Sequence, residues 1–189
     1  FGGILYGAMA KYPRPLSAAG RRNATDAVKR MAEFALAKDV TLGLEVVNRY
    51  ETNHLNTALQ ALEMLDRVNA PNVVVHLDTY HMNIEEPDFM QPVLACGKRL
   101  GYVHIGESNR GYLGSGTIDF AQFFKALAQI DYQGVVTFES FSSTVVNEEL
   151  SNALAIWRNL WDDGMDLAVH AREFMAGGLH AARMARQHG

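Results

Sequence analysis

Val73-Val-Val-His-Leu-Asp-Thr-Tyr-His81 carries the strongest structural signal in this sequence. It opens with β-branched apolar residues and changes abruptly to Asp78, with His81 three residues later. An uninterrupted apolar run of this kind is typical of a strand buried on both faces, as in parallel sheets. A carboxylate at the C-terminal tip of such a strand lies where parallel α/β barrels carry their chemistry. We therefore predict a parallel strand whose end contributes to a functional site.

Three further segments repeat this design, each a strand-like run that ends in a possible metal ligand. They are Thr41-Leu-Gly-Leu-Glu45, Gly101-Tyr-Val-His104 and Gly134-Val-Val-Thr-Phe-Glu139. Successive ligand candidates, starting from Glu45 and including Asp78, are separated by 33, 26 and 35 residues, close to the length of one βαβ unit. Parallel strands joined by helices point the same way, so all four side chains are expected on one rim.

Helical periodicity and capping residues predict helices between these strands. A short apolar run over Gly3–Tyr6 is a fifth predicted strand, and a glycine-rich loop is expected over 106–117. The predicted helices are 21–38 with Met31 and Phe34 inward, a helix from a cap at Asn56 to Val68 with Leu59 inward, a helix from a cap at Asp88 to about Leu100, a helix capped by Asp119 with Phe123 and Phe124 inward, 147–161, and a helix from Met165 towards the end that breaks at Gly177-Gly178.

The alternation of strands and helices indicates an α/β fold with a parallel sheet. Five strands are predicted, whereas a (β/α)₈ TIM barrel has eight strands and usually about 250 residues. The chain is therefore either an open five-stranded sheet or a barrel that lacks its first three units. Its start at Phe1, without a Met, favours the fragment: one domain over 1–189, incomplete at the N-terminus, with about five βα units (strands 4–8) plus C-terminal helices.

The bulk composition excludes several classes of protein. The formal net charge is −4 and there is no basic block, which argues against nucleic acid as a partner because phosphate binding needs clustered Lys and Arg. The single cysteine, Cys96, cannot form an internal disulfide, so a reducing cytoplasm is the expected location. The sequence contains no apolar run near the ~20 residues of a membrane span and opens with no signal peptide.

Three carboxylates and one imidazole around a common point suit a divalent cation. Oxygen-rich ligand sets favour Mn²⁺, Mg²⁺ or Co²⁺, whereas a structural zinc site uses more sulfur or imidazole. The alternative for each residue alone is an acid that caps a helix or faces solvent, but four such residues in successive units favour the metal.

Further polar residues lie just past the strand tips or near them. Glu51 and His81 are expected on the same rim, the alternative being loop residues in solvent. Arg110 is a candidate for holding an anionic or polyhydroxyl group, and otherwise an ordinary surface arginine. His76 shares the side of Asp78 one layer deeper in the strand and is interpreted as a hydrogen-bonded interior histidine, the alternative being a ligand. The remaining histidines are expected at the surface: His54, His170, His180 and His188.

Four segments resemble the ketose 3-epimerases, the D-tagatose, D-psicose (D-allulose) and L-ribulose 3-epimerase group of the xylose isomerase-like barrels. The resemblance extends from near Phe1 to at least Phe141, and Leu77–Glu86 is its most specific part. The segments are Leu44-Glu-Val-Val-Asn-Arg-Tyr-Glu51, His76-Leu-Asp-Thr-Tyr-His-Met-Asn-Ile-Glu-Glu86, Val103-His-Ile-Gly-Glu-Ser-Asn-Arg110 and Phe138-Glu-Ser-Phe141.

The resemblance implies a (β/α)₈ barrel, of which this chain covers the fourth unit to the C-terminus. It implies epimerisation of a free 2-ketose at C3 through a metal-stabilised enediolate, with Mn²⁺ favoured and Co²⁺ or Mg²⁺ possible. It also implies a homodimer or homotetramer for the full-length protein. The implied metal ligands are Glu45, Asp78, His104 and Glu139; the acid/base pair is Glu45 and Glu139; and the contacts to the C1–C3 end of the sugar are Glu51, His81 and Arg110.

Two alternatives stay open. An aldose–ketose or hydroxypyruvate-type isomerase on the same scaffold would share the metal rim, although Arg110 and the loop Asn48–Glu51 favour the epimerase. A chain lacking three barrel strands would expose two sheet edges and would be an inactive fragment as it stands. A trinuclear zinc nuclease of related fold is disfavoured by the few rim histidines and the acidic chain.

Overall fold

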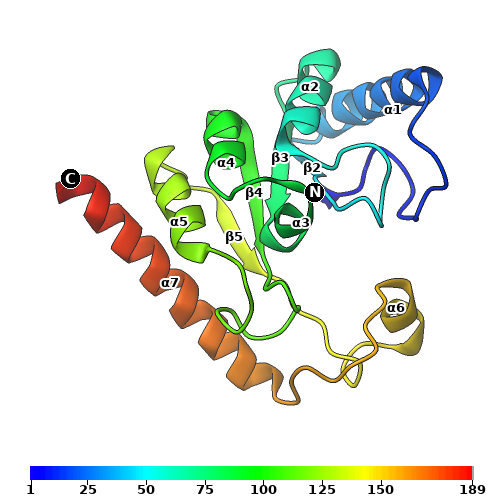
Figure 1. Ribbon diagram of the computed structural model, residues 1–189. Coiled ribbons are helices and arrows are strands. Elements are labelled where there is room, and N and C mark those ends of the chain that lie inside the picture. The colour runs from blue at the N-terminus through cyan, green and yellow to red at the C-terminus, as the bar shows by residue number, and fades with distance from the viewer. Residues whose placement is uncertain (189) are drawn as a thin grey trace.

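Five parallel strands form the centre of the structure, in the same order as in the sequence (Figure 1). The computed structural model describes residues 1–188. Every neighbouring pair of strands is parallel, so the predicted α/β fold with five strands is confirmed. The strands are β1 Gly2–Gly3, β2 Leu42–Glu45, β3 Val73–Asp78, β4 Leu100–Ile105 and β5 Val135–Phe138.

Helices follow one another around the outer side of this sheet and form the outer layer of a half-barrel (Figure 1). The long C-terminal helix packs against α5, and α6 lies apart, beyond the ends of the strands. Among residues 1–188, no helix combines the length and the apolar character needed to cross a bilayer. The helices are α1 Ala18–Leu36, α2 Ala58–Val68, α3 Thr79–Glu85, α4 Gln91–Cys96, the 3₁₀ turn η1 Gly97–Arg99, α5 Phe120–Gln129, α6 Glu148–Ala153 and α7 Gly164–His188.

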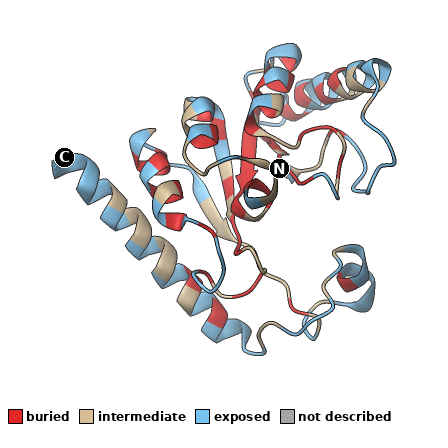
Figure 2. Ribbon diagram, in the orientation of Figure 1, coloured by how far each residue is buried: buried red, intermediate tan, exposed pale blue. Residues whose placement is uncertain are grey.

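The two faces of the sheet differ because side chains alternate along a strand. The outward-facing residues Leu44, Val75 and Val103 have no exposed surface and belong to the apolar core. Figure 2 shows the central strands largely buried and the helices buried on one side and exposed on the other. Burying one such side chain contributes roughly 1.5–3 kcal/mol. The inner face instead carries polar residues, among them His76 and His104, so the apolar layer anchors the strands that present the polar ones.

Local capping explains where several helices begin. Asp119 accepts a hydrogen bond from the Gln122 amide and caps α5 as predicted. For α2 the expected cap at Asn56 is wrong, because Thr57 and Gln60 form a reciprocal capping box instead, an arrangement that satisfies free amides of the first turn. The side chain of Asn56 instead donates to the carbonyls of Val47 and Thr52 and holds the loop after β2.

Several predicted boundaries are wrong. The first strand is only Gly2–Gly3, and the helix predicted from Asp88 to Leu100 ends at Cys96. Helix α3, which directly follows β3, was missed because Asp78 serves both as strand end and as the α3 cap. The helix predicted over 147–161 stops at Ala153, and Ala155 then has a left-handed φ of 55°.

Three apolar side chains predicted to point inward are exposed. Leu59 is 63% exposed on α2, and Phe34 and Met31 of α1 are 72% and 36% exposed. The two α1 residues line a groove of about 590 Å³ that also includes Phe1 and Leu42. This groove lies along the β1 side of the half-barrel, where β1 has a strand neighbour only on one side in residues 1–188. The helical periodicity correctly identified the apolar face of α1, but it could not show that part of this face is left exposed in residues 1–188.

The predicted break at Gly177-Gly178 is also wrong, since α7 runs unbroken from Gly164 to His188. A Cβ atom at Gly178 would lie 2.2 Å from the ring of Phe124 on α5, whereas one at Gly177 would meet nothing within 4 Å. Gly178 therefore permits close approach of two helices rather than ending one.

These adjacent glycines provide a matched test of the α5–α7 packing. We expect Gly178→Ala to lower the free energy of unfolding by about 1–3 kcal/mol because the new methyl group overpacks against Phe124. Gly177→Ala should raise it by up to about 1 kcal/mol through helix propensity. Urea denaturation of both variants measures this difference, and equal stabilisation by the two substitutions would contradict the packing described.

Candidate active site

Four side chains from four successive strands converge at the C-terminal end of the sheet. Glu45 ends β2, Asp78 ends β3, His104 lies in β4, and Glu139 directly follows β5. His104 Nδ1 lies 3.5 Å from a Glu45 carboxylate oxygen and 3.6 Å from a Glu139 carboxylate oxygen. Ligand atoms of Asp78, His104 and Glu139 all lie within 4.8 Å of one another. The structure thus brings together the four residues singled out in the sequence.

Strand register determines the depth at which each group lies. Asp78 is in register with His104, and Glu45 is in register with His76, one layer deeper. The Glu45 side chain therefore reaches upward to approach His104. A register irregularity between Val75 and His76 adjusts the alignment of β3 with β4.

Asp78 is completely buried yet ionised. Burial by itself raises the pKa of a carboxyl group, but Arg110 and His81 outweigh this and lower the pKa of Asp78 to about 2. One carboxylate oxygen also accepts a hydrogen bond of 2.8 Å from the amide of Tyr80. The negative charge is therefore held permanently at the centre of the rim.

The two glutamates of the rim have opposite pKa shifts. Burial raises the pKa of Glu139 to about 7, with Arg110 opposing the shift and Asp78 adding to it. Burial also acts on Glu45, but the interactions with His104 and His76 outweigh it and lower the pKa of Glu45. At neutral pH Glu45 is therefore ionised, while Glu139 exchanges a proton readily.

The two inner histidines differ in their surroundings. Burial lowers the pKa of His104, but Glu45 and Glu139 outweigh burial and raise it. His76 is 1% exposed, and burial lowers its pKa to about 4, so it is neutral. Neither ring nitrogen of His76 has a hydrogen-bond partner in residues 1–188. The interpretation as a hydrogen-bonded interior histidine is thus correct about burial and wrong about hydrogen bonding.

Arg110 is a buried residue of the rim, not an ordinary surface arginine. It is 6% exposed, and its Nη1 donates hydrogen bonds of 2.6 Å to Glu139 and 3.2 Å to Asp78. The guanidinium carbon lies 3.6 Å from the ring centroid of Tyr80, close enough for a cation–π interaction. Its backbone has a φ of 61°, which turns the chain so that the side chain points back into the site.

His81 and Glu51 lie beside this cluster and are joined by Asn48. The backbone amide of Asn48 donates to His81 Nδ1 at 3.1 Å, and the Asn48 side chain donates to Glu51 at 3.0 Å. The neutral His81 ring therefore carries its proton on Nε2, which faces Asp78 at 3.7 Å and Glu51 at 4.0 Å. Both residues predicted from the loop positions reach the rim.

Some residues that shape the site were not recognised in the sequence. Asn48 and Tyr80 lie within segments already of interest, but nothing in their spacing showed that they would orient His81 and Arg110. Thr79 links two strand ends, because its hydroxyl donates to the carbonyl of Gly106 and accepts from the Gly106 amide. His54, expected at the surface, is 5% exposed and lies with its ring edge-on to Tyr6.

The donor set of the rim fits a divalent cation. The carboxylates of Glu45, Asp78 and Glu139 lie around the imidazole of His104. The buried Nδ1 of this ring has no hydrogen-bond partner in residues 1–188. An orphaned imidazole nitrogen among carboxylates is the environment expected of a site that binds metal. The residues that could hold the ion are Glu45, Asp78, His104 and Glu139.

Comparison with known proteins connects this geometry to a family. Residues 3–169 match the family described as xylose isomerase-like TIM barrel. An L-ribulose 3-epimerase of Methylomonas sp. (strain DH-1) is 59% identical over 92% of this chain and 60% of its own length. A ketose 3-epimerase of Arthrobacter globiformis is 54% identical over 100% of this chain and 65% of its own length.

A solved structure gives the same picture. The crystal structure of a D-allulose 3-epimerase from Methylomonas sp., in complex with D-allulose, superimposes with a TM-score of 0.91 at 58% identity, covering 93% of this chain and 61% of that chain. The chain therefore spans about three fifths of the length of these relatives.

The raised pKa of Glu139 predicts how stability depends on pH in metal-free protein. The carboxyl group of a glutamate in an unfolded chain has a pKa of about 4.3. Between about pH 4.3 and pH 7 the folded protein therefore binds more protons at Glu139 than the unfolded chain does. This contribution to stability is complete below about pH 4 and is lost as the pH rises through about 7.

We expect Glu139→Gln to flatten this decline and to be more stable than the parent at pH 8 by about 2–3 kcal/mol. Denaturant unfolding of EDTA-treated protein at several values between pH 5 and 8 measures the slope. Parallel pH profiles for the two proteins would show that Glu139 does not carry the shifted pKa.

Proposed function

This chain belongs to the xylose isomerase-like TIM barrel family, and on that premise we propose that it carries the metal centre and proton-transfer pair of a ketose 3-epimerase. The substrate proposed is a free 2-ketose of the D-tagatose, D-fructose, D-psicose or L-ribulose type. Relatives named L-ribulose 3-epimerase and ketose 3-epimerase support this choice. We also propose that residues 1–189 supply five of the eight βα units of one barrel domain, since the relatives are longer.

The observation that carries the proposal is the pair of glutamates on either side of His104. Epimerisation at C3 requires one group to remove the proton next to the ketone and another to return a proton to the opposite face. Glu45 and Glu139 come from β2 and from the end of β5, and each lies within 3.6 Å of the same His104 nitrogen. Their pKa values are shifted in opposite directions, which is the arrangement expected of a base and an acid that act together.

Glu45 is ionised at neutral pH and is the group we propose to take a proton from C3. Glu139 has a pKa of about 7, so its protonated form is available to return one. In the reverse direction the roles exchange. Because Arg110 donates to Glu139 at 2.6 Å, it holds this carboxyl group in place and limits how far its pKa rises.

The proposed metal ligands are Glu45, Asp78, His104 and Glu139, with Mn²⁺ favoured and Co²⁺ or Mg²⁺ as alternatives. A divalent cation in this position supplies Lewis-acid polarisation of the ketone, which makes the C3 proton more acidic. Asp78 supports this role because it is ionised down to about pH 2, so one ligand is always charged. His104 is positioned by the register of β4 with β3.

The remaining rim residues are proposed to bind the C1–C3 end of the sugar. His81 presents an N–H, Glu51 presents a carboxylate, and Arg110 presents guanidinium N–H groups, so hydroxyl and carbonyl oxygens both find partners. Asn48 fixes His81 and Glu51 relative to each other. These groups orient a polyol chain without requiring a phosphate.

Isotope exchange tests the reaction directly. In D₂O the full-length protein should incorporate deuterium at C3 of D-fructose, D-tagatose or L-ribulose, because the proton removed there exchanges with solvent. NMR of the recovered ketose locates the label, and treatment with EDTA should abolish its incorporation. Label at C1 would instead identify an aldose–ketose isomerase, and no exchange with a metal-loaded protein would contradict both assignments.

Substitution of either rim glutamate should affect the chemical step. We expect Glu45→Gln and Glu139→Gln each to lower kcat roughly 10²–10⁴-fold at saturating Mn²⁺, since each removes one proton-transfer group. Glu63→Gln is a matched control, because this glutamate lies on α2 with 67% of its side chain exposed. Metal content of every variant is measured alongside, and a fully loaded Glu45→Gln protein with parental kcat would refute the assigned role.

A further inference from the structure

We propose a second cation position, one layer deeper than the rim, formed by Glu45, His76 and His104 and suited to a nitrogen-preferring divalent ion such as Zn²⁺. It shares two residues with the proposed metal centre and therefore competes with it. The inference rests on the proposed function, because an ion bound at this position would occupy Glu45 and His104, which the proposed function uses for proton transfer and for coordination of the catalytic metal. Zinc is accordingly expected to inhibit the enzyme through His76, a residue outside the proposed catalytic set.

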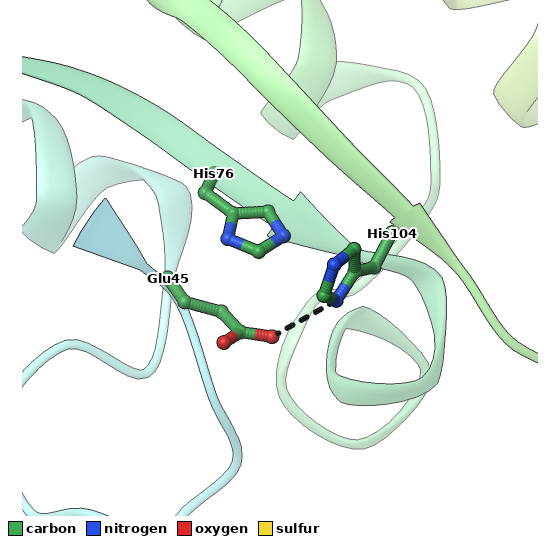
Figure 3. A group of neighbouring side chains, drawn as sticks. All are labelled: Glu45, His76 and His104. Carbon is green, nitrogen blue, oxygen red and sulfur yellow. Dashed lines mark ion pairs between the residues drawn. The ribbon is translucent and has the colours of Figure 1, made fainter. Parts of the chain in front are cut away.

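The three side chains come from the adjacent strands β2, β3 and β4 and point toward one another (Figure 3). One ligand atom of each lies within 4.8 Å of the other two. His76 and Glu45 are in register on neighbouring strands, and the rings of His76 and His104 meet edge-on with centroids 4.2 Å apart. A small inward adjustment of these side chains would bring all three donors to the ~2.0–2.2 Å that zinc requires.

The state of His76 is the independent reason to assign a ligand here. The ring is 1% exposed, and neither nitrogen has a hydrogen-bond partner in residues 1–188. A buried imidazole without partners loses the hydrogen bonds it would have in water. Coordination of an ion by one nitrogen would compensate for that loss, whereas stacking on its ring neighbours does not.

Small residues on the neighbouring strands leave room for this ring. A Cβ atom at Gly2 would lie 3.4 Å from His76 Nδ1, and a Cβ atom at Gly43 would lie 3.5 Å from His76 Cβ. Larger side chains at these positions would press on the imidazole. A Cβ atom at either position would make ordinary van der Waals contact with His76, so only side chains longer than alanine would compete with the ring for the interior of the half-barrel, where apolar side chains usually fill the space.

The chemistry of the two positions differs. The rim offers three carboxylates and one imidazole, a set that suits harder ions such as Mn²⁺ and Mg²⁺. The deeper position offers two imidazoles and one carboxylate, which matches the four-coordinate nitrogen and oxygen sites of zinc with one place left open. Zinc also binds such donors more tightly than manganese in the general order of divalent metals. One scaffold thus discriminates between the ions by depth.

Anomalous diffraction locates the ions without any substitution. Crystals of the full-length protein are soaked in Mn²⁺ alone or in Zn²⁺ alone, and data are collected at each absorption edge. We expect the manganese peak next to Asp78 and Glu139 at the rim, and the zinc peak next to His76 and Glu45 at the deeper position. Zinc found only at the manganese position would overturn the inference, even if zinc inhibits.

Variants of His76 test the same point in solution. His76→Gln and His76→Leu should weaken Zn²⁺ binding at least about tenfold by calorimetry, with Mn²⁺ affinity changed less than about threefold. Tyr102→Phe is the control, because Tyr102 contacts the His76 ring but its hydroxyl pairs with Thr137 outside the proposed site. Unchanged Zn²⁺ affinity in a folded His76 variant would overturn the inference.

The outcomes also separate this inference from the proposed function. Loss of Mn²⁺ binding in Asp78→Asn together with C3 exchange by the parent supports the epimerase, whatever zinc does. If the parent binds Mn²⁺ and exchanges C3 protons but zinc ignores His76, only the second position fails. If zinc uses His76 and no ketose is exchanged, the second position stands and the assigned reaction fails.

Discussion

The buried ion pair between Asp78 and Arg110 is the interaction on which the rest of the site depends. A carboxylate with no exposed surface is unfavourable unless it is paired and hydrogen-bonded, and Arg110 together with the Tyr80 amide supplies both conditions. The same guanidinium donates to Glu139 and stacks on Tyr80. Removing the arginine would leave two acids facing each other in a poorly hydrated space. One cation therefore determines the geometry and the charge of the rim.

Three carboxyl groups of the rim, two of them paired with Arg110, differ in their pKa values and therefore in their protonation at neutral pH. Asp78 is kept ionised, Glu45 is favoured as an anion chiefly by its interaction with His104, and the pKa of Glu139 is raised to about 7. The differences arise from what each carboxylate faces, because all three are carboxyl groups of similar intrinsic acidity. A parallel sheet makes this possible by delivering side chains from distant segments to one end.

The sheet has an apolar face toward the helices and a polar face toward the interior of the half-barrel because successive side chains of a strand point to opposite faces. Leu77 faces the helices and is fully buried among apolar side chains, while its neighbours His76 and Asp78 face the interior of the half-barrel. The polar layer extends below the rim to His76, so the interior of the half-barrel carries polar side chains at two depths.

Much of this organisation was readable in the sequence, because it depends on local patterns. Apolar runs ending in Glu45, Asp78, His104 and Glu139, at spacings of one βαβ unit, predicted parallel strands whose tips meet. What the sequence left open depends on contacts between segments distant along the chain. Register alone placed His76 level with Glu45. His54, expected at the surface, is buried, and the burial of Arg110 decided between its two interpretations. Phe124 gave Gly178 a packing role instead of a helix break. Hydrophobic periodicity reports which face of an element is apolar, whereas the neighbour that meets that face, and the pKa of each group there, follow only from the assembled structure.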